Sequence, residues 1–231
     1  MKALKYFSPF EWVLWISSLF TITIFFFAFD REGYMTLVAS LIGVTSLIFA
    51  AKGNPLGPLL MVFFSILYGI ISYSFAYYGE MITYIGMTLP MSVFAVVSWL
   101  KNPYKGKKSE VSVNRLTKKE IGFALILTAA VTVAFYFILD AFDTANIIPS
   151  TISVTTSFLA VYLTWRRSPY YALAYASNDI ILIILWVMAS IHDLSYLSVT
   201  VCFAVFLVND LYGFLCWKKM QKRQGESGIF H

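Results

Sequence analysis

The chain has 231 residues, of which 59% are hydrophobic and only 13% are charged. Water-soluble domains carry about 25% charged residues, so this composition excludes an ordinary soluble domain and indicates a surface that faces lipid. The formal net charge of +5 could suit a nucleic-acid-binding protein. The basic residues lie in short loops between apolar segments, however, where attraction to anionic lipid explains them with fewer assumptions.

Eight apolar stretches are long enough to cross a bilayer, because about 20 helical residues span about 30 Å of hydrocarbon. The first is longer than the apolar core of a signal peptide, and no small-residue cleavage site comes after it. The fourth is weakened at Pro90, which cannot donate to the carbonyl of Gly86. We therefore predict an all-α integral membrane protein. The stretches cover residues 10–29, 34–51, 56–78, 81–100, 121–139, 148–165, 170–189 and 194–217.

The charges between these stretches predict the orientation in the membrane. If the N-terminus lies in the cytoplasm, all 17 Lys and Arg residues except Arg31 fall on the cytoplasmic side. This agrees with the positive-inside rule, whereas a shift by one helix would scatter the basic residues over both sides. We expect a multi-pass membrane protein with both termini in the cytoplasm. The outer loops then carry the acids Asp30, Glu32, Glu80, Asp140, Asp143 and Asp193.

One long hydrophilic segment, rich in lysine, comes after the fourth stretch and divides the chain into halves. Its last part, Thr117-Lys118-Lys119-Glu120, is typical of a capped helix start and leads into the fifth stretch. We interpret the chain as a single transmembrane domain. Its parts are an extra N-terminal helix at 10–29, repeats at 34–101 and 148–218, a linker with a linking helix at 102–147, and a cytoplasmic tail at 219–231.

The two blocks that flank the linker, 34–101 and 148–218, share a layout of three apolar stretches each. In both, a basic turn with a proline comes after the first stretch, at 52–55 and 166–169, and the third stretch ends in tryptophan and lysine. Both begin outside, so we interpret them as parallel repeats, with the single stretch 121–139 between them. Internal repeats are typical of transporters, whose substrate sites lie where the repeats meet. A chance likeness of apolar triplets is the alternative.

The candidate binding site lies on the seventh stretch. Tyr171, Tyr175 and Asn178 fall on one face of the predicted helix, with Asp179 beside them. Polar groups at mid-membrane are costly and usually functional. This face would suit a flat ligand with hydroxyl groups, which an amide and a carboxylate can hydrogen-bond. Alternatively, Asn178 and Asp179 hold helices together while the tyrosines pack.

Two further candidates are Tyr84, close to Pro90, and Asn209, next to Asp210 in the last stretch. Asn209 could face the same cavity or contact a neighbouring helix. The sequence contains neither a phosphate-binding loop nor a cluster with zinc-ligand spacing. We therefore expect no catalytic residue, no metal and no cofactor.

Several motifs make the chain similar to the PnuC family of bacterial vitamin transporters, over about residues 34–222. The family's best-known substrate is nicotinamide riboside, and the resemblance implies a place in the bacterial plasma (inner) membrane. The resemblance implies two three-helix bundles joined by a linking helix in a SWEET-like arrangement, often as a homotrimer. It also implies facilitated diffusion, with the substrate trapped by phosphorylation in the cytoplasm. The motifs are Asn54, Gly57, Tyr77-Tyr78-Gly79-Glu80-Met81, Pro90-Met91, Trp99-Leu100-Lys101-Asn102, the aromatic-then-acid run of the seventh stretch, Gly213 and Trp217-Lys218.

The seventh stretch departs from the family pattern Trp-x-x-Trp-x-x-x-Asn/Asp, in which the two tryptophans stack on the substrate ring. Depending on which member of Asn178-Asp179 takes the last position, Tyr171 and Ala174, or Ala172 and Tyr175, replace the tryptophans. A lost stack of about 1–3 kcal/mol would change the ligand preference. A deoxynucleoside, thiamine, riboflavin or nicotinamide mononucleotide therefore remains open as the substrate.

We predict a carrier for nicotinamide riboside or a related vitamin or nucleoside, not an enzyme. Tyr171 and Tyr175 would hold the ring, Asn178 and Asp179 would bond the ribose or amide, and Asn209 is a further candidate. Two other classes stay open as alternatives. A membrane-embedded enzyme would need a nucleophile or a metal cluster, and a receptor or scaffold would need larger loops or a soluble domain.

Overall fold

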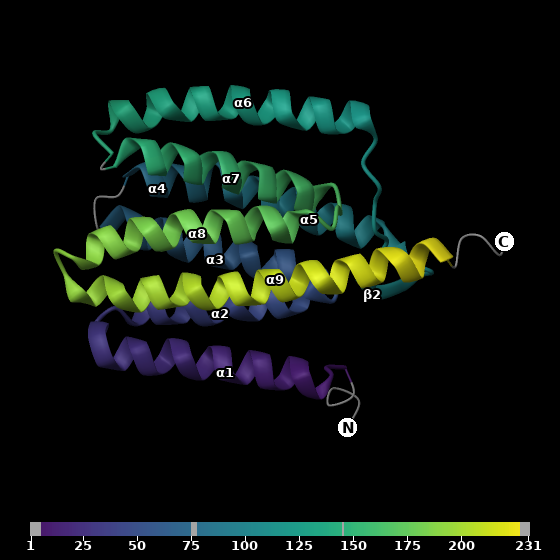
Figure 1. Ribbon diagram of the computed structural model, residues 1–231, viewed down its shortest axis with the longest axis horizontal. Coiled ribbons are helices and arrows are strands. Elements are labelled where there is room, and N and C mark those ends of the chain that lie inside the picture. Colours follow the sequence, from purple (N-terminus) through teal and green to yellow (C-terminus); the bar gives the residue numbers. More distant parts are fainter. Residues whose placement is uncertain (1–5, 75–77, 145, 227–231) are drawn as a thin grey trace.

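The computed structural model describes residues 6–74, 78–144 and 146–226 and consists mainly of long helices that lie side by side (Figure 1). In these residues eight helical segments are long and apolar enough to cross a membrane, which confirms the predicted number of spans. The α-helices are α1 (Pro9–Phe25), α2 (Tyr34–Ala51), α3 (Leu56–Ser74), α4 (Tyr78–Ile82), α5 (Leu89–Lys101), α6 (Lys118–Ala141), α7 (Ile147–Trp165), α8 (Tyr171–Ser190) and α9 (Leu197–Glu226).

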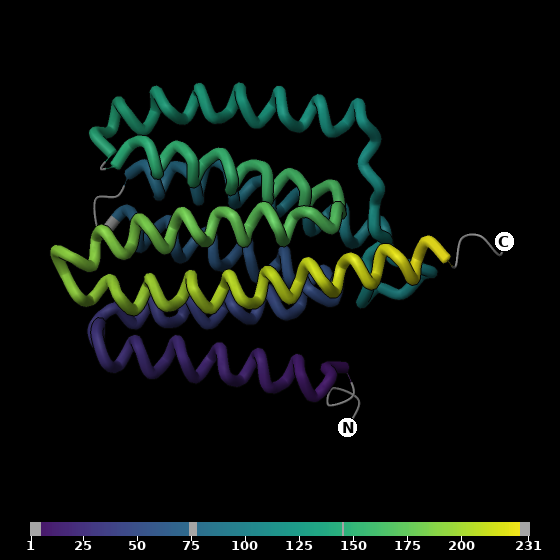
Figure 2. Tube along the Cα trace, viewed as in Figure 1, coloured from purple at the N-terminus to yellow at the C-terminus, as the bar shows by residue number. Residues whose placement is uncertain are grey.

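Successive spans run in opposite directions, so the loops gather at two ends of the bundle. We name the end where α1 begins and α9 ends the basic end, because it carries Lys52, Lys101 and the linker. The other is the acidic end, which carries Asp30 and Asp193. Figure 2 traces the chain between the two ends, with α1 and α6 at opposite edges of the bundle.

The described part departs from an all-helical chain in the linker, where β1 (Pro103–Tyr104) and β2 (Lys107–Val111) form an antiparallel hairpin. The sequence pattern does not predict this hairpin. The last helix continues past the predicted end of the eighth stretch, because α9 runs to Glu226, and the division into span and tail stays a prediction. Lysine, glutamine and arginine favour helices, and basic side chains near a helix C-terminus interact well with its dipole.

Two helix starts are capped in the same way. Thr117 Oγ1 accepts from the Glu120 N–H at 3.3 Å, and Glu120 Oε2 accepts from the Thr117 N–H at 2.8 Å. This capping box confirms the predicted start of α6. Ser8 and Glu11 form a second capping box at the start of α1, where Pro9 is the first helical residue. Both helices thus begin where short-range chemistry satisfies their first N–H groups.

The fourth span is interrupted by a π-helical turn, Thr83–Thr88, between α4 and α5. The Leu89 N–H donates to the Tyr84 carbonyl, one residue further back than in an α-helix. Pro90 lies in the first turn of α5, where a missing N–H costs little. The weakness predicted at Pro90 therefore appears as a wide turn just before it, and such turns are frequent at functional sites.

Helix contacts divide the bundle into two groups. Within residues 34–101, α3 packs on both α2 and α5, and within 147–226, α8 packs on both α7 and α9. The groups meet through α2 with α9 and through α5 with α7, while α1 packs on α2 and α9. The linking helix α6 packs chiefly on α7. Their relation as parallel repeats stays a prediction.

Two buried tryptophans make matched contacts between the groups. Trp99 Nε1 donates to the Thr164 carbonyl at 2.9 Å, and Trp217 Nε1 donates to the Ala50 carbonyl at 2.8 Å. Both rings are fully buried, with centroids 5.2 Å apart. Each indole thus reaches from the third helix of one group to the last turn of the first helix of the other.

The linker connects the turns that come after those two carbonyls. Gly53 and Arg167 both have a left-handed backbone, with φ values of 66° and 57°. The Val111 N–H donates to the Gly53 carbonyl, and the Asn114 N–H donates to the Arg167 carbonyl, each at 2.9 Å. Gln224 of α9 holds the same segment, because its Oε1 accepts from the Val113 N–H at 2.7 Å. The linker is therefore bonded to both groups at the basic end.

Candidate functional site

Polar side chains of α7, α8 and α9 meet in the interior of the bundle. Asn178 of α8 is 4% exposed, and its Oδ1 accepts hydrogen bonds from three hydroxyl groups of α7. The donors are Thr156 at 2.9 Å, Ser157 at 3.0 Å and Ser153 at 3.1 Å. The amide oxygen thus links α8 to α7, as in the alternative interpretation of this residue.

The neighbouring acid contacts a different helix. Asp179 and Asp210 of α9 are 3% and 4% exposed, and their carboxyl groups are neighbours in the bundle interior. Neighbouring buried carboxylates repel each other when both are ionised. The two acids therefore act as one electrostatic unit between α8 and α9, which we name the acid pair. Asp179 is a predicted site residue, whereas Asp210 is not among the predicted site residues.

The three predicted tyrosines are buried near these groups. Tyr84 lies in the π-helical turn, within electrostatic range of Asp179. Tyr175 lies near Thr164 and near both acids of the pair. Tyr171 is closer to the basic end, where its ring centroid is 5.0 Å from that of Trp217 and 6.2 Å from that of Tyr175. The predicted face of α8 thus carries tyrosines, whereas the family pattern has tryptophans. Tyr84 and Trp217 add aromatic rings from other helices.

Asn209 is not part of this cluster. Its Nδ2 donates to Ser18 Oγ of α1 at 3.0 Å and to the Val205 carbonyl at 2.9 Å. The side chain therefore joins α9 to α1, on another face of α9 from the acid next to it in the chain. Of the six predicted site residues, the structure brings together Tyr84, Tyr171, Tyr175, Asn178 and Asp179.

A wide cavity of about 490 Å³ lies at the acidic end. A small cavity of about 10 Å³ shares Gly79, Glu80, Thr144 and Ser150 with it. The small cavity reaches Tyr84 and the Ser153 and Ser157 hydroxyls that bind Asn178. Polar groups thus continue from the acidic end into the centre. The wide cavity is lined by Tyr78, Glu80, Phe142, Asn146, Trp186 and His192, among others.

Glu80 is the acid that lines both of these cavities. The prediction that it lies in an outer loop is wrong, because it belongs to α4, and its Oε2 is buried without a hydrogen-bond partner among the described residues. Its neighbour in the Tyr-Gly-Glu motif, Tyr77, lies outside the described residues. A carboxylate oxygen without a donor beside a cavity is available to a ligand that carries a positive charge or a donor.

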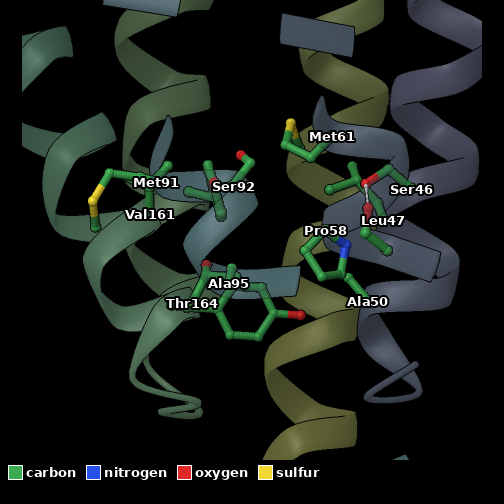
Figure 3. Close-up of a pocket in the computed structure, with 13 residues that line it drawn as sticks. Ser46, Leu47, Ala50, Pro58, Met61, Met91, Ser92, Ala95, Val161 and Thr164 are labelled. Atoms are coloured by element: carbon green, nitrogen blue, oxygen red, sulfur yellow. Dashed lines mark hydrogen bonds between the residues drawn. The ribbon is translucent and has the colours of Figure 1, made fainter. Parts of the chain in front are cut away.

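A third cavity, of about 20 Å³, lies nearer the basic end, between the two helix groups. Figure 3 shows Ser46, Pro58 and Met61 on one side of it, facing Ser92 and Thr164. Tyr171 and Tyr175 also line it. This space holds about one water molecule, whereas small-molecule sites have about 300–1,000 Å³. The bundle is therefore open at the acidic end and closed towards the basic end.

Comparisons with known proteins agree with this fold. The model of the nicotinamide mononucleotide transporter family matches residues 33–219. A protein of Neisseria mucosa named nicotinamide riboside transporter PnuC is 25% identical over 217 residues, which cover 91% of this chain and 81% of the relative. A Haemophilus influenzae protein of the same name is 22% identical over 216 residues, with 93% and 92% covered.

A solved structure, the crystal structure of the vitamin B3 transporter PnuC, superimposes with a TM-score of 0.81. The two chains are 23% identical, and 94% of each is covered. This likeness confirms the helical membrane fold, and the curated relatives confirm the resemblance to PnuC proteins. Because the family model spans most of the sequence, the chain belongs to the nicotinamide mononucleotide transporter family, whose members are membrane carriers rather than enzymes.

Proposed function

We propose that this chain carries nicotinamide riboside, or a chemically related vitamin or nucleoside, across the bacterial inner membrane by facilitated diffusion. The curated relatives bear the name of a nicotinamide riboside transporter. The observation that carries the proposal is the line of polar groups from the wide cavity, past Glu80, to Tyr84 and the hydroxyls around Asn178. With the basic end in the cytoplasm, this route would accept substrate from outside.

The charge along the route favours a cationic ring. Nicotinamide riboside and thiamine both carry a fixed positive charge on an aromatic nitrogen. Glu80 and the Asp179–Asp210 pair would attract such a charge, and the faces of Tyr84 and Tyr175 offer further attraction. Riboflavin and deoxynucleosides lack this charge, and the phosphate of nicotinamide mononucleotide opposes it. We therefore rank nicotinamide riboside first and thiamine second.

Phosphorylation in the cytoplasm would keep uptake directed inward. A phosphorylated nucleoside carries negative charge, and a route that contains Glu80 and the acid pair repels it. Exit of the free substrate would require the helix groups to separate around the small cavity that Tyr171 and Tyr175 line. Such rocking of two repeats about a central site is the usual form of alternating access. A homotrimer, as the family resemblance implies, remains part of this proposal.

Uptake of labelled nicotinamide riboside into proteoliposomes tests the proposal. We expect saturable uptake that runs down the concentration gradient without ATP and that thiamine inhibits more strongly than riboflavin. Glu80→Gln should raise KM, because it removes a charge from the route. The matched control Glu32→Gln removes a charge from the same end, outside the residues that line the cavities, and should leave KM unchanged.

The results that would count against the proposal are equally specific. Stronger inhibition by riboflavin or a deoxynucleoside than by thiamine would contradict the preference for a cationic ring. Uptake that requires an ion gradient would contradict facilitated diffusion. Equal effects of Glu80→Gln and Glu32→Gln on KM would show that only the total charge of the acidic end matters. Glu80 would then not lie on the route.

A further inference from the structure

A separate cavity of about 450 Å³ lies at the basic end, on the outer side of the bundle between α6 and the second helix group. Its walls are mainly apolar, and several wall residues are exposed: Leu125 is 58% exposed, Tyr170 49% and Ile121 46%. Leu159 and Leu163 of α7 complete the apolar part. The groove shares no lining residue with the cavities on the transport route.

The groove exists because α6 is attached on one side only. Thr132 Oγ1 of α6 lies 2.8 Å from Thr155 Oγ1 of α7, and the two helices pack together along their length. Asn114 and Arg115 of the linker line the groove between the first turns of α6 and the start of α8. The groove therefore lies beside the first turns of a predicted membrane span.

The mouth of the groove is positively charged. Arg115 lines it, and Lys218 lies beside it, with Nζ 5.1 Å from the Tyr170 ring centroid and 3.3 Å from Gln221 Oε1. Within the described part of the chain, neither cation has an ion-pair partner, whereas the nearby Arg166 is paired with Glu120. An apolar slot below two unneutralised cations is complementary to a lipid with an anionic headgroup.

We propose that this groove binds one anionic phospholipid from the leaflet at the basic end. The phosphate would lie between Arg115 and Lys218, and an acyl chain would run along Leu125, Leu159 and Leu163. Basic pockets between membrane helices on the cytoplasmic side bind anionic headgroups, and tyrosine is favoured at the level of the headgroups, where Tyr170 lies. The bound lipid would tie α6 to α8 and α9, which it otherwise barely contacts. This inference is independent of the transported substrate.

Native mass spectrometry of the purified full-length chain can measure the affinity for dioctanoyl phosphatidylglycerol, dioctanoyl phosphatidylcholine and glycerol phosphate. We expect phosphatidylglycerol to bind most tightly. The double variant R115Q/K218Q should bind it about 30-fold more weakly, because each basic residue near an anionic lipid contributes about a factor of five. The control K105Q/K107Q removes the same charge from the exposed hairpin on the same side and should bind as the original chain does.

A second variant tests the apolar part without a change of charge. Leu125→Trp narrows the groove and should weaken phosphatidylglycerol binding, while thermal unfolding in phosphatidylcholine shows that the variant is folded. Equal affinity for the two phospholipids would overturn the proposal, as would an equal loss in the control pair. Glycerol phosphate that binds as tightly as the lipid would indicate a site for a free anion. Disulfide-linked dimers of Leu125→Cys would show that a second copy covers the groove. Either result would also overturn it.

Discussion

Replacement of Asn178 separates a role in helix contact from a role in ligand binding. Its amide oxygen accepts three hydroxyl groups of α7, from Ser153, Thr156 and Ser157. Hydrogen bonds between membrane helices contribute about 0.6 kcal/mol each on average. Asn178→Ala should therefore reduce the free energy of unfolding by about 2 kcal/mol, the sum of three such bonds. Equilibrium unfolding in mixed micelles measures this loss, and the uptake assay measures KM in parallel.

Two comparisons complete this test. Ser177→Ala changes the adjacent residue, whose hydroxyl bonds the Leu173 carbonyl on an exposed face, and should cost less than about 0.5 kcal/mol. The double variant S153A/S157A removes two of the three donors, so adding Asn178→Ala to it should cost clearly less than Asn178→Ala alone. A loss below about 0.5 kcal/mol for Asn178→Ala, together with loss of uptake, would refute the contact role and assign the amide to the substrate.

Three further predictions concern other contacts. Trp99→Phe and Trp217→Phe should each reduce the free energy of unfolding by about 1 kcal/mol, because each loses one indole hydrogen bond between the helix groups. Thermal unfolding measures both losses. A difference of more than about 2 kcal/mol between them would contradict matched roles for the two tryptophans. Thr117→Ala should cost about 1 kcal/mol by removing the α6 cap, and Thr117→Ser should restore most of it in the same unfolding assay. Asp179→Asn removes one acid of the pair and should weaken uptake of cationic substrates more than that of any neutral substrate; equal effects on both would contradict a charge-based role.

The sequence predicts features that depend on neighbouring residues. Apolar length and charge bias locate the eight spans, and the Thr117–Glu120 pair marks the start of α6, because a capping box satisfies helix N–H groups within one turn. The two strands of the hairpin are too short to give a pattern. Their position depends on a bond from Val111 to Gly53, which lie far apart in the chain.

The candidate site could be predicted only in part, because the same residue types serve contact and binding. The mid-membrane position of Asn178 and Asp179 indicates that they need polar partners, but it cannot identify Ser153, Ser157 or Asp210 as those partners. Asn209 bonds Ser18, which is 191 positions away in the chain. Glu80 lies between two predicted spans in the sequence, so its place beside the central route becomes clear only when α4 is packed against α3 and near α7.

The bonds of the linker to both helix groups have a mechanical consequence. Residues 111–114 fasten the turn at Gly53 to the turn at Arg167, so the groups share a fixed edge on one side of the membrane. When two rigid bodies share an edge, rotation displaces the opposite edge most. The mouth at the acidic end can therefore widen with both bonds intact, whereas separation of the two turns at the basic end has to break at least one of them. In the proposed transport mechanism, release of the substrate at the basic end should then be the slower half of each cycle.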